Sequence, residues 1–358
     1  MKNRYLHFAA SLLACTVIGG HAAYAQPQQA AGELFTIRVA QQPQRWALPW
    51  FVASEKGWWK ELGLKPEIFT FASGAPEIAA GASDSWDVGG AGNIPSVLGA
   101  SRYGLTTIAI ANSEEQIITL SATKEKADEY VRNPALLKGK TIPVPTNSTG
   151  HWGAMVCMSK KFGIKPDEYR LVNLSPPEIN AAMSSGRYDV AQVWAPNTYL
   201  LEDSMGIKPI CTGQEVGLPI TSNVFVTPKF AEAHPQETAK FLAIYLRGVA
   251  WEKAHPKEAE EMLGKFFTSA GVNIPPKYLS VELKSRPSYT LSEQLERMTP
   301  DASGKSFLSE SWRQVADFMV SVGVARKVPD YEDFATNKYL KLIAADPTLK
   351  AFAENTSD

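Results

Sequence analysis

The chain has 358 residues, with 36 lysine and arginine side chains against 37 aspartate and glutamate, a formal net charge of −1 when histidine is neutral. Nothing in this balance indicates the concentrated basic surface of a nucleic-acid-binding protein, and the length suffices for two domains of ordinary size. The five histidines and three cysteines form no H-E-x-x-H, C-x-x-C or paired-histidine pattern. We therefore expect no metal, no cofactor and no nucleic-acid partner.

Residues 1–25 have the pattern of a secretory signal peptide. Lys2 and Arg4 precede an apolar run over residues 8–18, and Ala23-Tyr24-Ala25 matches the cleavage site that signal peptidase accepts. The apolar run is shorter than the roughly 20 residues that span a bilayer. We expect a periplasmic mature chain that starts near Gln26. In the alternative, residues 12–15 form a lipoprotein signal, and Cys15 anchors the protein to a membrane.

Short apolar runs alternate with amphipathic segments along most of the chain. A first series of strands is predicted at residues 36–40, 67–71, 87–91 and 106–111, with a helix over 50–62. A second series is predicted at residues 139–144, 170–174, 188–194 and 208–211, and helices follow at 235–255, 256–267, 291–298 and 307–322. This alternation predicts an α/β protein with open, mostly parallel sheets.

An internal sequence repeat indicates that these elements form two lobes. Residues 76–78 and 86–88 (P-E-I and W-D-V) return as residues 177–179 and 188–190 (P-E-I and Y-D-V), at offsets of 101 and 102 residues. Two ordinary helix-to-strand units can match by coincidence, but order and spacing together favour a duplication. We expect lobe I at 34–121 and 227–345, lobe II at 122–226 and a tail at 346–358. Strands at 116–123 and 222–226 would connect the two α/β lobes as a two-strand hinge.

Residues 139–152 carry the strongest candidate site. A strand runs into a stretch of small hydroxyl and amide residues, and a helix starts at Ser148 or Thr149, which can cap it. Gly150 lets a ligand approach the backbone, and the free N–H groups with the helix dipole favour an anion. An ordinary capped helix has the same sequence. The Gly-rich turn at residues 89–95, which lacks the P-loop pattern, occupies the corresponding place in lobe I.

Aromatic and amide side chains at other strand ends complete the candidate cleft. Trp194 and Asn197 follow a strand of lobe II, and Gln42 and Trp46 follow the first strand of lobe I. A tryptophan at a strand end is also typical of an ordinary core. Ser148 and His151 have no identifiable third partner and G-x-S-x-G is absent, so we expect no catalytic residues and no enzyme.

The remaining cysteines, Cys157 and Cys211, can form a disulfide or stay as two buried thiols. Sequence alone leaves both possibilities open, because it does not give their separation.

Several stretches resemble the periplasmic binding proteins of ABC importers for sulfonates, taurine and nitrate, and most closely the taurine-binding branch. They are residues 55–59, 138–152, 163–166, 172–179, 193–196 and 230–235. The resemblance implies a periplasmic binding protein-like type II fold, no catalysis, and delivery of a small anionic ligand to a permease with a cytoplasmic ATPase. We also expect a monomer. By motif match the resemblance assigns these residues to the cleft: Gly92, Asn93, Asn112, Ser148, Thr149, Gly150, His151 and Trp194.

One position departs from the taurine-binding pattern. Asn223-Val224-Phe225 stands where those proteins carry Asp-Val-Trp, and asparagine cannot supply the charge that pairs with an amine. Glu114 is the candidate substitute. Asn223 therefore argues against simply assigning taurine. From the loop at residues 148–151 and the resemblance we expect an organosulfonate of the taurine or alkanesulfonate class, with nitrate, an aromatic carboxylate or sulfonate, and a pyrimidine vitamin precursor as alternatives. A pyrimidine-forming enzyme on the same fold would need a nucleophilic cysteine or a cofactor-linked histidine in the cleft.

Overall fold

The largest sheet joins the first four strands of the chain to the last one. In the computed structural model, which describes residues 33–321, 323 and 334–358, its order is β2-β1-β3-β10-β4. These strands are β1 (Phe35–Gln41), β2 (Leu64–Thr70), β3 (Val88–Gly92), β4 (Thr106–Ser113) and β10 (Thr221–Val226). β1 pairs in parallel with β2 and β3, whereas β10 runs antiparallel to both β3 and β4. The expected signal peptide and Cys15 lie outside the described residues.

Two smaller sheets contain the strands of the middle of the chain. β5 (Ile118–Ala122) lies between β8 (Val190–Trp194) and β9 (Lys208–Thr212), antiparallel to both. β6 (Thr141–Val144) and β7 (Arg170–Asn173) form a parallel pair. The two-lobed α/β fold is as predicted, but the expectation of mostly parallel sheets was wrong. After the three-stranded sheet the chain returns to the five-stranded one through β10, which enters between β3 and β4 in the opposite direction to both.

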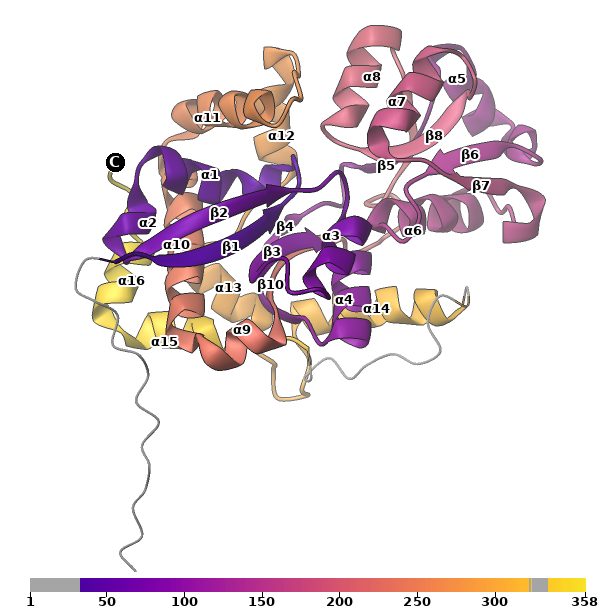
Figure 1. Ribbon diagram of the computed structural model, residues 1–358. Helices are drawn as coiled ribbons and strands as arrows, with labels where there is room; N and C mark the ends of the chain where they lie inside the picture. The colour runs from indigo at the N-terminus through magenta and orange to yellow at the C-terminus, as the bar shows by residue number, and fades with distance from the viewer. Residues whose placement is uncertain (1–32, 322, 324–333) are drawn as a thin grey trace, which may run out of the picture. The chain divides into compact units, whose positions relative to one another are not determined.

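Helices pack on the sheets and form most of the chain after residue 228 (Figure 1). Those before it are α1 (Leu48–Glu55), α2 (Trp58–Glu61), α3 (Gly74–Gly81), α4 (Asn93–Tyr103), α5 (Lys124–Arg132), α6 (Thr149–Val156), α7 (Pro176–Ser184) and α8 (Asn197–Met205). Those after it are α9 (Pro228–Ala233), α10 (Pro235–Ala254), α11 (Pro256–Ser269), α12 (Leu279–Ser285), α13 (Leu291–Met298), α14 (Phe307–Ser321), α15 (Lys338–Ala345) and α16 (Pro347–Ala353).

Two local expectations differ from the structure. The single helix predicted over residues 50–62 is two helices, α1 and α2, because Gly57 between them takes a left-handed conformation with φ of 76°. Residues 346–358, expected as a tail, contain α16, and Trp251 Nε1 donates to Asp358 Oδ1 at 2.9 Å. The lobe boundaries themselves stay a prediction.

The echoed sequences fold into equivalent units. α3 leads into β3 and α7 leads into β8, so each copy is a helix followed by a buried strand, as predicted. β3 belongs to the five-stranded sheet and β8 to the three-stranded sheet. The repeat therefore places one helix-to-strand unit in each half of the fold.

Buried aromatic side chains help to fix the helices beside the large sheet. Trp50 is buried with its ring 5.7 Å from Phe241 and 5.4 Å from Tyr245, which fixes α1 against α10. A disulfide between Cys157 and Cys211 joins the end of α6 to β9, which answers the question left open by the sequence. Among the described residues, no helix is both long and apolar enough to cross a membrane, and no cluster of metal-ligating side chains occurs.

Candidate functional site

One small cavity, of about 30 Å³, lies where the sheets meet helix ends. Its walls come from the ends of β1 and β8, the starts of α3, α4 and α6, and the segments next to β5 and β10. The lining residues are Gln42, Gln44, Trp46, Gly74, Gly92, Pro95, Glu114, Ile118, Ser148, Thr149, Trp194 and Ser222. Seven of the predicted site residues are therefore brought together in it: Gln42, Trp46, Gly92, Glu114, Ser148, Thr149 and Trp194.

Three helix N-termini converge on this cavity. Gly74 is the first residue of α3, Gly92 is the N-cap of α4, and Ser148 is the N-cap of α6. Each N-terminus carries unbonded N–H groups and roughly half a positive charge from the helix dipole. The arrangement can hold an anion without a fixed cation.

The start of α6 is shaped by its cap. Ser148 Oγ accepts a hydrogen bond from the N–H of His151 at 3.0 Å and donates to the carbonyl of Pro145 at 2.5 Å. This cap satisfies His151, whereas the N–H groups of Thr149 and Gly150 have no acceptor among the described residues. Of these two residues Thr149 lines the cavity, so its N–H remains for a ligand.

The starts of α4 and α6 touch each other beside the cavity. Thr149 Oγ1 accepts from the N–H of Ile94 at 3.4 Å, and a Cβ built on Gly92 would overlap Thr149 Oγ1. Only glycine permits this approach. The Gly-rich turn predicted as the counterpart of the Ser148 loop does face it.

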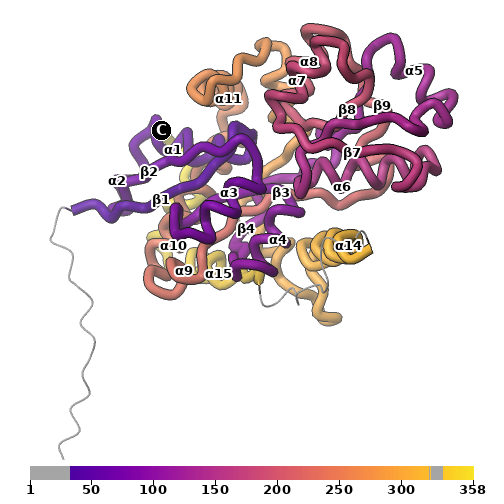
Figure 2. The backbone as a smooth tube through the Cα atoms, turned by 45° about the vertical axis from the view of Figure 1, so that its right-hand side comes forward, coloured from indigo at the N-terminus to yellow at the C-terminus, as the bar shows by residue number. Residues whose placement is uncertain are grey.

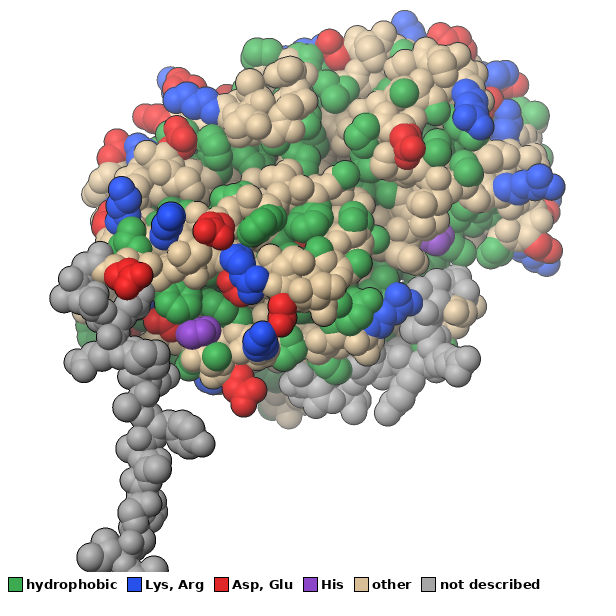
Figure 3. Space-filling view, in the orientation of Figure 1, with side chains coloured by type: hydrophobic (Ala, Val, Ile, Leu, Met, Phe, Trp, Pro, Cys, Tyr) green, Lys and Arg blue, Asp and Glu red, His purple; other side chains and the backbone are tan. Residues whose placement is uncertain are grey.

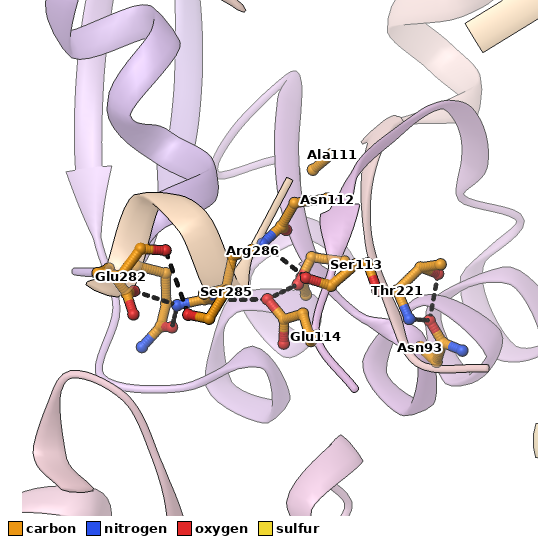
Figure 4. Close-up of polar contacts among 12 residues, drawn as sticks. Asn93, Ala111, Asn112, Ser113, Glu114, Thr221, Glu282, Ser285 and Arg286 are labelled. Carbon is orange, nitrogen blue, oxygen red and sulfur yellow. Dashed lines mark hydrogen bonds and ion pairs between the residues drawn. The ribbon is translucent and has the colours of Figure 1, made fainter. Parts of the chain in front are cut away.

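Glu114 provides the opposite wall and is the only ionisable side chain among the described residues that line the cavity. Its Oε1 accepts from Ser222 Oγ at 2.5 Å and from Arg286, while Arg286 also donates to Glu282 Oε1 at 2.6 Å (Figure 4). Although desolvation opposes it, the attraction of the two carboxylates raises the pKa of Arg286. Both bonds to Glu114 end on Oε1, which leaves Oε2 for a ligand.

The remaining walls are aromatic and amide. Trp46 lies edge-on to Trp50 with ring centroids 5.6 Å apart, and Trp194 closes another side. Gln42 Nε2 donates to the buried Glu77 at 2.7 Å, which fixes the amide that lines the cavity. The site therefore combines three helix N-termini, two indoles and one carboxylate.

Three predicted residues near β10 do not line the cavity but support its wall. Asn93 Oδ1 accepts from both the N–H and Oγ1 of Thr221, at 3.0 and 2.5 Å (Figure 4). Asn223 donates to Ser96 Oγ at 3.2 Å and is fully buried. Asn112 is also fully buried, donates to the carbonyl of Ser113 at 3.3 Å and has no partner for Oδ1 among the described residues.

Three other predicted residues also lie outside the lining. Gly150 makes room for the buried Gln192, whose amide a Cβ would overlap, rather than for a ligand side chain. Burial lowers the pKa of His151, and its Nδ1 accepts from the N–H of Asn147 at 3.3 Å. Asn197 Oδ1 accepts from Asn180 Nδ2 at 2.8 Å.

The sequence interpretation missed several lining residues. Gln44 extends the polar run after β1, so the strand-end rule that selected Gln42 could have found it. Gly74 starts a helix after β2, so the same rule could have identified it. Ser222 gave no signal, because a serine in a buried strand is typical of many structural positions.

Comparisons with known proteins agree with this architecture. A family model described as NMT1/THI5 like matches residues 46–259. A Bacillus subtilis (strain 168) protein, named as a candidate aliphatic sulfonates-binding protein, is 25% identical over 82% of this chain and 84% of its own. The taurine-binding periplasmic protein of Escherichia coli (strain K12) is 34% identical over 51% of this chain and 56% of its own. The alkanesulfonate-binding protein SsuA from Xanthomonas axonopodis pv. citri, bound to MOPS, superposes with a TM-score of 0.69 at 18% identity, over 86% of this chain and 99% of that one.

Proposed function

The chain belongs to the NMT1/THI5-like family, and from this premise we propose that it is the solute-binding component of an ABC importer. It acts in the periplasm as a monomer, captures a small ligand with an anionic group, and delivers it to a permease that works with a cytoplasmic ATPase. Relatives named for binding aliphatic sulfonates and taurine support this role.

The convergence of three helix N-termini carries the proposal. The starts of α3, α4 and α6 line one cavity that contains no basic side chain among its described lining residues. Backbone N–H groups and helix dipoles are then the source of positive potential for an anion. A sulfonate, which has three acceptor oxygens and no proton to give at neutral pH, suits a site made of donors.

Glu114 narrows the ligand class. A buried carboxylate in the cavity wall disfavours a bare anion such as nitrate, since two like charges at short range repel each other strongly in a site of low dielectric. A ligand that carries an amine beside its sulfonate would place the amine at Glu114 Oε2 and the sulfonate at the helix starts. We therefore favour a small aminoalkanesulfonate of the taurine class.

The aromatic walls support a second candidate. Trp46 and Trp194 offer flat apolar surface, and Glu114 can accept from an exocyclic amine. An aminopyrimidine, the class of a pyrimidine vitamin precursor, matches these groups but leaves the helix starts without an anion.

No catalytic role is part of the proposal. The Cys157 and Cys211 sulfurs are bonded to each other, and neither residue lines the cavity. His151 does not line it either. A nucleophilic cysteine or a cofactor-linked histidine, which the enzyme alternative requires, is therefore not found among the described cavity residues.

The proposal is tested by calorimetric titration of the purified mature protein with taurine, ethanesulfonate, nitrate and an aminopyrimidine. We expect taurine to bind most tightly. In Glu114→Gln the affinity for taurine should fall at least about tenfold, because a charge-assisted hydrogen bond is lost, while ethanesulfonate binds as well as before or better.

Glu115→Gln is the matched control, because Glu115 is the next residue and does not line the cavity. It should leave every affinity unchanged. Tight binding of the aminopyrimidine with no response to taurine would select the second candidate. No binding of any anion would overturn the proposal.

A further inference from the structure

Glu77 is a buried carboxyl group one side chain away from the candidate cavity. It lies on α3, the helix whose first residue, Gly74, lines the cavity, and this helix packs against β3 and α4 (Figure 1). Glu77 is fully buried and does not itself line the cavity. It would therefore act on a ligand through a neighbouring side chain that does.

Gln42 is that neighbour. Its Nε2 donates to Glu77 Oε2 at 2.7 Å, and the residue lines the cavity. Gln42 Oε1 has no hydrogen-bond partner among the described residues, yet it keeps some accessible surface, unlike the wholly enclosed amide of Gln192. The free end of the Gln42 amide is therefore an end that a ligand can reach.

The hydrogen bonds of Glu77 depend on its state of charge. Oε2 accepts from Gln42 Nε2 and Oε1 accepts from the N–H of Gly90 at 3.2 Å, so both oxygens are acceptors, as in a carboxylate. A neutral carboxyl group must donate through one oxygen. Gly90 offers only a backbone N–H there, whereas Gln42 can change its role, because turning its amide over exchanges oxygen and nitrogen at nearly the same positions.

The surroundings of Glu77 disfavour its charged form. Desolvation raises its pKa to about 8, and only the hydrogen bonds from Gln42 and Gly90 oppose this rise. No charged side chain contributes to the shift. The titratable side chains on the described elements around Glu77 are Arg38 of β1, Arg45 of the following turn, Asp84 after α3, Asp87 before β3, Arg102 and Tyr103 at the end of α4, and Glu114 in the cavity wall.

We propose that Glu77 is a positioning residue, which sets the end of the Gln42 amide that faces the ligand. When Glu77 is neutral, its hydroxyl donates to Gln42 Oε1, and Gln42 Nε2 faces the cavity as a donor. When Glu77 is charged, Gln42 Oε1 faces the cavity, with a negative charge behind it. The inference rests on the proposed function, because the neutral pair adds a donor for a sulfonate to those at the helix starts.

Proton binding at Glu77 and sulfonate binding in the cavity are then coupled, and each strengthens the other. With a pKa of about 8, Glu77 is mostly neutral at pH 6.5 and mostly charged at pH 9.5. The apparent affinity falls with the fraction of protein that remains in the binding form. Sulfonate affinity should therefore decrease as pH rises through about 8, and binding in this range should take up protons.

Calorimetric titration of the purified mature protein with ethanesulfonate tests the coupling, since this ligand carries no amine that titrates. We expect wild type to bind at least about tenfold more weakly at pH 9.5 than at pH 6.5. At pH 8.5, titrations in two buffers of different ionisation enthalpy should show proton uptake. Glu77→Gln offers Gln42 a donor and Gly90 an acceptor at every pH, so it should show neither the loss of affinity nor the proton uptake.

Gln42→Met is a second variant, which keeps the length of the side chain and removes both amide groups. It should bind ethanesulfonate about tenfold more weakly than wild type at pH 6.5, because a hydrogen bond to a charged group is lost, and with little further loss at pH 9.5. Glu67→Gln changes an exposed carboxylate on β2 and is the matched control. It should keep the affinity and the pH profile of wild type.

Two kinds of failure can be told apart. Equal ethanesulfonate affinity of wild type at pH 6.5 and 9.5, or the same pH dependence in Glu77→Gln as in wild type, would overturn the role of Glu77 and leave the proposed function standing. Binding of neither ethanesulfonate nor taurine at pH 6.5 would overturn the proposed function, and this inference with it.

Discussion

Glu77 is a fully buried carboxyl group that contacts Gln42 of the candidate cavity. It accepts from Gln42 Nε2 at 2.7 Å and from the N–H of Gly90 at 3.2 Å, and these contacts fix the turn after β1 against β3. Desolvation, only partly offset by the two hydrogen bonds, raises the pKa of Glu77 to about 8. The side chain is therefore largely protonated in the folded protein at neutral pH.

This shift predicts a pH dependence of stability. In the unfolded chain a glutamate has a pKa of about 4.3, so between that value and about 8 the folded state holds a proton that the unfolded state has released. Stability from this group is complete below the unfolded pKa and is lost as pH rises through the folded pKa. We expect the free energy of unfolding to fall less from pH 5 to pH 8.5 in Glu77→Gln than in wild type.

Urea unfolding at the two pH values measures the difference. Glu67→Gln, an exposed carboxylate on β2, is the control and should follow wild type. Glu252 contributes a similar slope to all three proteins and cancels in the comparison. Parallel profiles for wild type and Glu77→Gln would show that Glu77 is charged in the folded state.

At the scale of elements, the disulfide ties the end of α6 to β9. Cys157 follows the helix whose N-terminus lines the cavity, and Cys211 lies in the three-stranded sheet, 54 residues later. Closing a loop of this length reduces the entropy of the unfolded chain, which is worth about 2–4 kcal/mol. The bond therefore stabilises the part of the fold that positions Ser148.

We expect Cys157→Ala/Cys211→Ala to lower the free energy of unfolding by about 2–4 kcal/mol, measured by urea unfolding under oxidising conditions. Wild type in dithiothreitol should approach the double variant, whereas the double variant should not respond to the reductant. An unchanged midpoint in either case would mean that the bond contributes no net stability.

At the scale of the molecule, α8 and the segment before α12 meet through contacts that continue into the cavity wall. Tyr199 stacks on Tyr278 with ring centroids 4.7 Å apart, and its hydroxyl donates to Glu282 Oε2 at 2.8 Å. Arg286 forms ion pairs with both Glu282 and Glu114. Trp152 of α6 lies against Phe318 of α14, with centroids 5.9 Å apart, as the neighbouring positions of these helices in Figure 2 show.

These contacts join the parts that carry the two larger sheets, so we expect them to strengthen binding by stabilising the ligand-competent arrangement. Tyr199→Phe keeps the ring stacking and removes one hydrogen bond to a carboxylate. Calorimetry should show taurine affinity weaker by about fivefold, the value of roughly 1 kcal/mol. Tyr188→Phe, just before β8, is the control, and an equal loss in both variants would contradict the role of Tyr199.

The surface agrees with the composition. Figure 3 shows basic and acidic side chains interspersed on one face, with apolar side chains between them and no large region of a single sign. This is the surface expected of a chain with 36 basic and 37 acidic side chains. Such a surface does not provide the long-range steering of a strongly charged partner.

The sequence by itself determined most of the strands and helices, their arrangement in two successive series, and the start of α6. Apolar periodicity, the proline-started helices and the cap at Ser148 are local signals, so β1, β3, β8 and α10 lie close to their predicted bounds. The resemblance to binding proteins added the cleft as an expectation, and Gly92, Ser148 and Thr149, which it assigned there, line one cavity. The direction of β5 and β10 was not available in this way, because strand polarity depends on partners far along the chain.

Only the tertiary structure decided which side chains form the wall of the cavity. Successive residues of a strand face opposite sides, so Ser222 lines the cavity while Asn223 binds Ser96 inside the core. A motif match does not reveal which residues of a strand face the cavity and which face the core. The position of the Glu114 side chain in the cavity wall depends on its contact with Arg286, which lies 172 residues later in the chain. A contact over that distance is set by tertiary packing and not by local sequence.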